Sequence, residues 1–410
     1  ERVLATGYWI YNDLNAAYEQ ARQSGKPILV VLRCLPCEEC VQLDDDLVES
    51  DPELKSLLDQ YVRVRVVGTN GLDLSVFQYD TDQSFAVFML NADKTIYGRF
   101  GTRSHRTEWF GDVSLTGLAE ALKGALALHK DYPANKPGLV GKTGTALEFA
   151  SPEKYPNLKD RYTATLKTKG EIAKSCIHCH QIGDARREFY RTKGETIPEK
   201  LLFSYPHPKS IGLIMDPELR ATVKDVTEES LAAKAGFKAG DQIDALNGQP
   251  LLSIADVQWV LHNADPNGAD VTALIKRGES RRPLTLSLPK GWRRNDDITW
   301  RASSWGLRRM VTGGIKLAAL SDEERREAGV DSGKLALRVD HVGQYNKHAV
   351  AKRAGVKEGD IIVSFNGRSD DMTRSQLMAY GIESTKPGQK VPVTFLRGKQ
   401  RIDVKLLMQE

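Results

Sequence analysis

Apolar runs alternate with segments of helical periodicity in the first third of the chain. Residues 27–33 form a nearly continuous apolar run, which is typical of a strand buried on both faces, and an amphipathic helix is predicted before it at 13–24. Further strands are predicted at 61–67, 85–90 and 95–100, and a closing helix at 115–129. This pattern predicts an α/β domain over residues 1–135.

The pattern changes over residues 136–208, where strand alternation stops and Lys, Arg and Glu become frequent. Helices are predicted at 159–174 and 183–193. A helical segment of this length has little apolar core of its own. We therefore expect a bound group to supply part of the missing apolar surface.

An internal repeat organises the C-terminal half of the chain. Residues 231–248 return as 350–367, and both copies read AG-x-K-x-GD-x-I-x-x-x-NG. Each copy predicts a short helix ended by Gly, a turn, a buried strand and an Asn-Gly hairpin. The elements predicted after it are a helix at 253–263 or 373–382 and a strand pair at 271–276 with 284–288 or 391–396 with 402–407. We therefore expect two α+β domains, a first repeat at 209–290 and a second repeat at 307–410, joined by a Trp- and Arg-rich linker at 291–306.

Length, charge and hydropathy narrow the classes of function. A chain of 410 residues is expected to form several domains, and a net charge of +4 gives no case for binding nucleic acid. No apolar run reaches the roughly 20 residues of a membrane-spanning helix. The chain shows no signal-peptide pattern at Glu1, so we expect an exported protein whose signal peptide has been removed.

The five cysteines form two tight clusters, which indicates redox or metal sites rather than a disulfide framework. One cluster lies in Cys176-Ile177-His178-Cys179-His180, which has the C-x-x-C-H spacing of covalent haem attachment. Two thiols one helical turn apart add to the porphyrin vinyl groups, and the following histidine reaches the iron. We expect one covalent c-type haem at Cys176, Cys179 and His180. Zinc or inert thiols are the alternatives.

The second axial position of this haem is open in the sequence. His207 lies in the Pro-flanked stretch Tyr205-Pro206-His207-Pro208 and is our candidate, with an ordinary exposed loop histidine as the alternative. Met215 also follows at a suitable distance, but it belongs to a predicted strand. A ligand from a neighbouring molecule or an open position remains.

The second cysteine cluster opens the helix predicted after residues 27–33. The segment SGKPILVV at 24–31, followed by Cys34-Leu35-Pro36-Cys37, resembles the secreted branch of the thioredoxin family. The resemblance implies a catalytic disulfide couple of Cys34 and Cys37. At a helix N-terminus, Cys34 would be favoured as the thiolate.

Three departures from the thioredoxin pattern keep other uses of this cluster open. Arg33 stands where the family has tryptophan, and residues 84–87 lack the proline that faces the motif. Cys40 adds a third thiol one turn beyond Cys37, so that Cys34, Cys37 and Cys40 could bind Cu(I) or zinc. A disulfide without catalytic role is the third interpretation.

The two repeats resemble bacterial PDZ domains such as those of Deg-type periplasmic proteases. The resemblance implies that a peptide C-terminus adds as a strand and that its carboxylate rests on backbone N–H groups of a Gly-containing loop. This loop corresponds to Gly212 and Leu213 in the first repeat and to Gly314 and Ile315 in the second. PDZ folds that only pack within the chain are the alternative. No G-x-S-x-G segment or triad-like placement predicts a protease.

Together these features predict a multidomain protein with an α/β thioredoxin-like domain, a short α-helical haem segment and two α+β PDZ-like domains. We expect a haem c electron-transfer protein of the periplasm or cell exterior, with protein partners recruited by the PDZ-like domains. Thiol-disulfide exchange or haem-dependent catalysis stays open, as does a homo-oligomer. The alternative is a non-catalytic scaffold whose cysteines bind zinc or copper.

Overall fold

The computed structural model describes residues 7–33, 52–83, 85–102, 113–167, 170 and 172–410. Cys34, Cys37 and Cys40 lie outside these residues. Contacts divide the chain into two compact units, one formed by Glu1–Ile182 with Ser204–Asn295 and the other by Gly183–Phe203 with Asp296–Glu410. The α/β domain and the first repeat therefore belong to one unit, and the second repeat belongs to the other.

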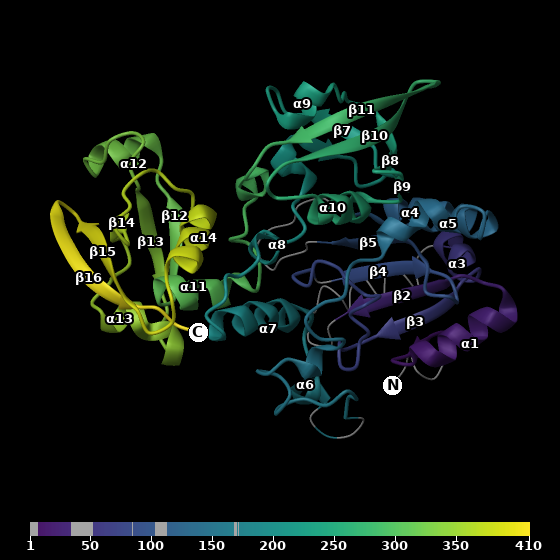
Figure 1. The fold of residues 1–410 in the computed structure, drawn as a ribbon, viewed down its shortest axis with the longest axis horizontal. Helices are drawn as coiled ribbons and strands as arrows, with labels where there is room; N and C mark the ends of the chain where they lie inside the picture. The colour runs from purple at the N-terminus through teal and green to yellow at the C-terminus, as the bar shows by residue number, and fades with distance from the viewer. Residues whose placement is uncertain (1–6, 34–51, 84, 103–112, 168–169, 171) are drawn as a thin grey trace. The chain divides into compact units, whose positions relative to one another are not determined.

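The predicted α/β domain forms around a five-stranded sheet in the order β1-β3-β2-β4-β5 (Figure 1). Its strands are β1 (Ile10–Tyr11), β2 (Ile28–Arg33), β3 (Val62–Val66), β4 (Phe85–Leu90) and β5 (Ile96–Thr102). β2 runs parallel to β3, whereas β4 is antiparallel to both β2 and β5. The four strands predicted from the apolar runs are thereby confirmed.

The helices of this domain are α1 (Leu14–Ser24), α3 (Pro52–Leu58), α4 (Leu115–Lys130) and α5 (Lys136–Leu139). α1 begins after Asp13, whose side chain accepts the N–H of Ala16, and ends at Gly25 in the left-handed conformation. α4 begins after Ser114, which accepts the N–H of Gly117. Both predicted helices are confirmed.

The first repeat consists of two small sheets and two helices. Its elements are β6 (Leu213–Met215), β7 (Val223–Val226), α9 (Leu231–Ala235), β8 (Gln242–Leu246), β9 (Gln249–Pro250), α10 (Ile254–Asn263), β10 (Ala269–Arg277) and β11 (Ser280–Leu288). β6 pairs with β7, and the other strands follow the order β11-β10-β8-β9. A short 3-10 helix, η4 (Pro208–Ile211), leads into β6.

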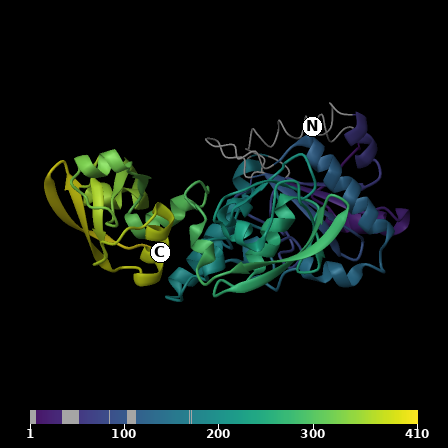
Figure 2. The same ribbon diagram turned by 90° about the horizontal axis from the view of Figure 1, so that it is seen from above.

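The second unit holds the second repeat and most of α7 (Cys179–Thr192). Its other helices are α8 (Glu199–Leu202), α11 (Ser304–Thr312), α12 (Asp322–Glu327), α13 (Val350–Arg353) and α14 (Arg374–Ser384). One sheet runs in sequence order through β12 (Ile315–Ala319), β13 (Leu337–Val342), β14 (Ile361–Phe365), β15 (Lys390–Arg397) and β16 (Gln400–Leu407). Figures 1 and 2 show this sheet from two directions, with the β15–β16 hairpin in yellow.

The two copies of the sequence repeat share one ion pair. In the first, buried Asp241 receives the guanidinium of Arg277 through Nε at 2.6 Å and Nη2 at 2.7 Å. In the second, buried Asp360 receives Arg397 in the same way, at 2.7 and 2.8 Å. Each aspartate also accepts a backbone N–H three residues before it. The Gly-Asp motif thus fixes the same turn in both copies.

The helix predicted at 159–174 is wrong, since only α6 (Ile172–Ser175) forms at its end. Side chains compete here for the backbone groups that a helix would use. Thr163 Oγ1 donates to Thr165 O at 2.9 Å, and the amide of Asn70 takes Thr163 O at 2.8 Å. The helix predicted at 183–193 is confirmed as α7, but it already begins at Cys179.

Candidate functional site

The pentapeptide that begins at Cys176 lies against the chain that leaves β3. Asn70 Oδ1 accepts the N–H of Ile177 at 2.9 Å, and Asn70 Nδ2 donates to Ser175 O at 3.0 Å. Thr69 donates to Ile177 O twice, from its backbone N–H at 3.1 Å and from Oγ1 at 2.9 Å. These bonds hold the backbone on both sides of Cys176 to the α/β domain.

The thiol of Cys176 fills a space that Gly68 leaves open. A Cβ atom on Gly68 would lie 2.8 Å from Cys176 Sγ and 3.1 Å from Leu166 Cδ1. The thiol points toward Val67 O, at 3.7 Å, and the residue is 1% exposed. Burial, and to a lesser extent the neighbouring Cys179, raises the pKa of Cys176 to about 11. The folded site therefore holds this group as the neutral thiol.

Cys179 and His180 form the first turn of α7. Cys179 is buried and carries a free thiol like that of Cys176, whereas His180 is half-buried. His178 donates its N–H to Gln181 Oε1 at 2.8 Å, and Gln181 donates to Tyr162 Oη at 3.2 Å. Burial, with the nearby His180, lowers the pKa of His178. Two thiols and an imidazole thus follow one another within a single anchored turn.

The same sheet edge carries the strand that leads to Cys34. β2 and β3 are parallel neighbours with Leu32 level with Val66, so β2 ends at Arg33 beside the residues that contact Cys176. Cys34 is the next residue in the sequence. Because the carboxyl ends of parallel strands meet at one edge, the chain brings the pentapeptide to the end of the sheet from which the first cysteine cluster departs.

Metal ligation was tested among the residues that the structure describes. They hold no group of three or more His, Cys, Asp or Glu side chains arranged for a metal ion. The predicted copper or zinc site at Cys34, Cys37 and Cys40 falls outside them. A separate search of the described helices found none long and apolar enough to cross a membrane.

The structure places His207 and Met215 in the first repeat. His207 is buried at the start of η4, where its Nδ1 accepts the N–H of Lys209 at 3.2 Å. It is therefore not the exposed loop histidine of the alternative interpretation. Met215 is buried in β6, as the strand prediction required. Its side chain belongs to the apolar core of the first repeat.

The loops predicted to bind a peptide carboxylate use their glycine N–H groups locally. The N–H of Gly212 donates to Lys209 O at 3.0 Å, and that of Gly314 donates to Arg308 O at 3.1 Å. Both glycines have positive φ, 89° and 94°. Leu213 and Ile315 are buried and begin β6 and β12. Carboxylate binding at either loop would therefore rest on other N–H groups.

Sequence reasoning missed Gly68, Thr69 and Asn70. The signal that could have found them is a Gly-Thr-Asn-Gly turn directly after a buried strand, at residues 68–71. Polar residues that follow a parallel strand lie at the edge where functional groups gather. Their partners, however, come more than 100 residues later in the chain.

Comparisons with known proteins agree with parts of this organisation. The thioredoxin-like family matches residues 9–92 and the PDZ domain family matches residues 222–277. The periplasmic pH-dependent serine endoprotease DegQ of Escherichia coli (strain K12) is 30% identical over 152 residues, which are 37% of this chain and 29% of that protein. The periplasmic serine endoprotease DegP of the same strain is also 30% identical over 152 residues, 37% of this chain and 27% of that protein.

Among solved structures, the HtrA-type protease AlgW with decapeptide is similar at 17% identity, over 35% of this chain and 49% of that chain, with a TM-score of 0.22. The chain spans less than a third of the length of the two curated relatives. The protein is therefore multidomain, contains a thioredoxin-like domain and a PDZ domain, and has periplasmic Deg-type proteases among its relatives.

Proposed function

We propose that this protein is an exported redox protein that carries one covalent c-type haem and recruits protein partners through its repeats. The observation that carries the proposal is the anchored turn at Cys176. It presents two thiols and His180 in the order and spacing that haem attachment requires. When bound, the haem would supply an iron that accepts and returns one electron.

The donor set of the turn fits this group. Cys176 and Cys179 would hold the porphyrin through thioether bonds, and His180 would ligate the iron. Thr69 and Asn70 fix the backbone from which all three side chains project. Since an axial ligand must hold one orientation, these two residues position the ligand turn without belonging to it.

The state of Cys176 indicates when attachment takes place. In the folded chain this thiol is 1% exposed, and its raised pKa disfavours the thiolate. Leu166 packs against the glycine that faces it. Attachment before the segment around Leu166 folds over Cys176 would avoid both obstacles. We therefore propose that haem is added to the unfolded or partly folded chain.

An intact-mass measurement combined with a pyridine haemochrome spectrum tests the proposal. The full chain is expressed with haem-maturation machinery, and the expected mass is that of the polypeptide plus one haem. The variant Cys176→Ala/Cys179→Ala should have the bare mass and no haemochrome band. Wild-type protein with the bare mass would overturn the proposal, and so would covalent haem in the double variant.

For Cys34, Cys37 and Cys40 we propose a thiol-disulfide couple, supported by the match of residues 9–92 to the thioredoxin-like family. Binding of copper or zinc is the competing outcome. Metal analysis combined with thiol counting separates the two, because a couple changes its thiol count by two on reduction while a metal site keeps stoichiometric metal. The variant Cys40→Ala should leave the couple intact.

Recruitment of partners is supported by the PDZ domain match at residues 222–277 and by the sequence repeat. The names of the relatives place them in the periplasm, and we propose the same compartment for this chain. A fusion of the full-length precursor to a reporter active only outside the cytosol tests this location. We do not carry over the relatives' protease activity.

A further inference from the structure

Helix α10 of the first repeat is enclosed on all sides. All nine residues from Ile254 to His262 are buried, including the polar side chains of Asp256, Gln258 and His262. A helix at the surface of a domain normally leaves one polar face in water. The elements that cover α10 therefore include some outside its own repeat. They come largely from the thioredoxin-like domain, which belongs to the same compact unit.

Asp256 joins the helix to the thioredoxin-like domain. Its Oδ1 accepts the N–H of Arg99 in β5 at 3.1 Å and lies 3.0 Å from Lys142 Nζ, and its Oδ2 accepts the N–H of Leu252 at 2.9 Å. The side chains of Lys142 and Asp256 are 1% and 0% exposed. Such a pair is stable only when both partners stay in place, since either charge alone would be buried without compensation.

Arg99 completes the contact from the side of β5. Its guanidinium lies 3.7 Å from the ring centroid of Trp259 in α10 and donates to Gln78 O and Lys142 O. In return, Ser253 Oγ donates to Arg99 O at 2.5 Å. Arginine, tryptophan and serine side chains therefore bind the two domains through stacking and hydrogen bonds along the same strand.

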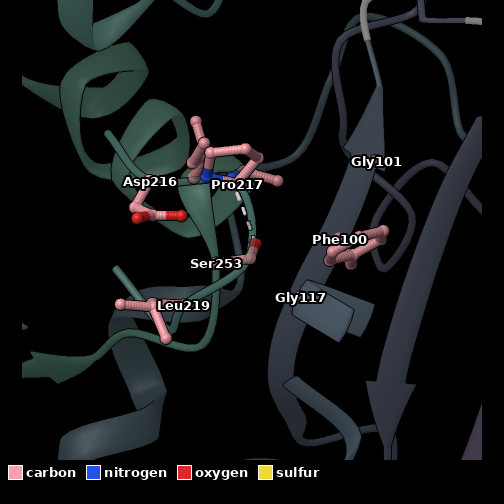
Figure 3. Close-up of a pocket in the computed structure, with 9 residues that line it drawn as sticks. Phe100, Gly101, Gly117, Asp216, Pro217, Leu219 and Ser253 are labelled. Atoms are coloured by element: carbon pink, nitrogen blue, oxygen red, sulfur yellow. Dashed lines mark hydrogen bonds between the residues drawn. The ribbon is translucent and has the colours of Figure 1, made fainter. Parts of the chain in front are cut away.

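The space beside the start of α10 is also closed. Phe100, Gly101 and Gly117 of the thioredoxin-like domain face the stretch from Asp216 to Leu219 that follows β6 (Figure 3). The cavity left between them has about 10 Å³, which is room for one water. Gly117 has no side chain where Pro217 O comes close, and Ser114 Oγ donates to the same carbonyl at 2.9 Å.

We propose that the thioredoxin-like domain is the resident partner of the first repeat, and that it excludes peptides from the space between the end of β6 and the start of α10. A peptide added beside β6 in the PDZ manner would need the space that Phe100, Gly101 and Gly117 fill. The first repeat then acts as a structural part of the thioredoxin-like domain, and recruitment of partners is left to the second repeat. This inference stands independently of haem binding.

Hydrogen exchange of the full chain, followed by mass spectrometry, tests the contact. In wild-type protein the amides of α10 and β5 are expected to exchange together and as slowly as those of β10 and β11. The variant Asp256→Asn should accelerate exchange in both α10 and β5, on the order of tenfold or more. Gly117→Ala, which removes no charge, should accelerate the stretch 216–219 and α4 in the same coupled way.

Asp241→Asn is the matched control, because Asp241 is a buried carboxylate that pairs within its own repeat. It should loosen β8 and β10 and leave β5 unchanged. Fast exchange of α10 in wild-type protein overturns the inference, as does Asp256→Asn that loosens α10 alone. Protection of Leu213–Met215 in wild-type protein by an added decapeptide with a free, apolar C-terminus would also overturn it.

Discussion

Asn70 Oδ1 accepts the N–H of Ile177 at 2.9 Å across 107 residues of sequence. The bond joins the end of a central strand of the thioredoxin-like domain to the residue that follows Cys176. Because Asn70 also donates to the carbonyl that precedes Cys176, one side chain fixes the backbone on both sides of the first thiol. The candidate haem turn is therefore part of the thioredoxin-like domain's structure rather than a loop beside it.

Replacement of Asn70 by alanine should destabilise the first unit and disorder the turn. It leaves the N–H of Ile177 and the carbonyl of Ser175 without their side-chain partner, which costs about 1–3 kcal/mol. Urea denaturation of the protein made without haem measures the loss. Asn263→Ala is the control, since Asn263 is exposed and donates one bond to Trp259 O. Equal stability losses in the two variants would contradict the role given to Asn70.

Replacement of Gly68 by alanine should force the turn away from β3. The added Cβ would lie 2.8 Å from Cys176 Sγ, and overpacking of this kind costs about 1–3 kcal/mol. Removal of the sulfur in Gly68→Ala/Cys176→Ala should recover part of the loss, so the two changes are not additive. A double-mutant cycle by urea denaturation measures this coupling, and strictly additive losses would count against the contact. Gly138→Ala, which meets Gly248 O only at 3.4 Å, is the control.

Local patterns predicted the elements well where one segment decides its own structure. The apolar run at 28–33 became β2, and the periodic stretch that ends at Asn263 became α10. The Gly-Asp motif predicted the turn around Asp241 and Asp360. Its arginine partners, Arg277 and Arg397, were not predicted, because they lie 36 and 37 residues further along the chain.

The candidate site was predicted in its chemistry but not in its setting. The spacing of Cys176, Cys179 and His180 could be read directly from the sequence, whereas the contacts of Thr69 and Asn70 depend on folding. The burial of α10 was equally hidden. Its sequence predicts an ordinary amphipathic helix, and only the packing of β5 against Asp256 and Trp259 shows that the polar face is covered.

The raised pKa of Cys176 predicts a loss of stability at alkaline pH. The unfolded thiol ionises near pH 9 and the folded thiol near pH 11, so the folded state binds more protons between these values. The contribution of this group is therefore complete below pH 9 and falls as pH rises toward 11. Free energies of unfolding at pH 8, 9, 10 and 11 measure it in wild-type protein and in Cys176→Ala.

The comparison with Cys176→Ala is needed because burial also raises the pKa of Tyr18 to about 12 and that of Tyr61 further. These groups weaken both proteins alike above pH 10. The difference between the two curves isolates Cys176 and should decrease from pH 9 upward. A difference that stays constant to pH 11 would show that the thiol is not held neutral by the fold.

Arg191 of α7 should be one of the most sensitive positions of the second unit. Its guanidinium donates to Ile382 O and Thr385 O at the end of α14, to Thr385 Oγ1 and to Gln409 O, and burial lowers its pKa to about 10. Arg191→Leu leaves these carbonyls without a donor, at a cost of about 3 kcal/mol. Urea denaturation should show this loss, with early fraying of α14 in hydrogen exchange. Arg326→Ala, exposed in α12, should change stability by less than about 0.5 kcal/mol. Unchanged exchange of α14 in Arg191→Leu would show that the helix ends without this arginine.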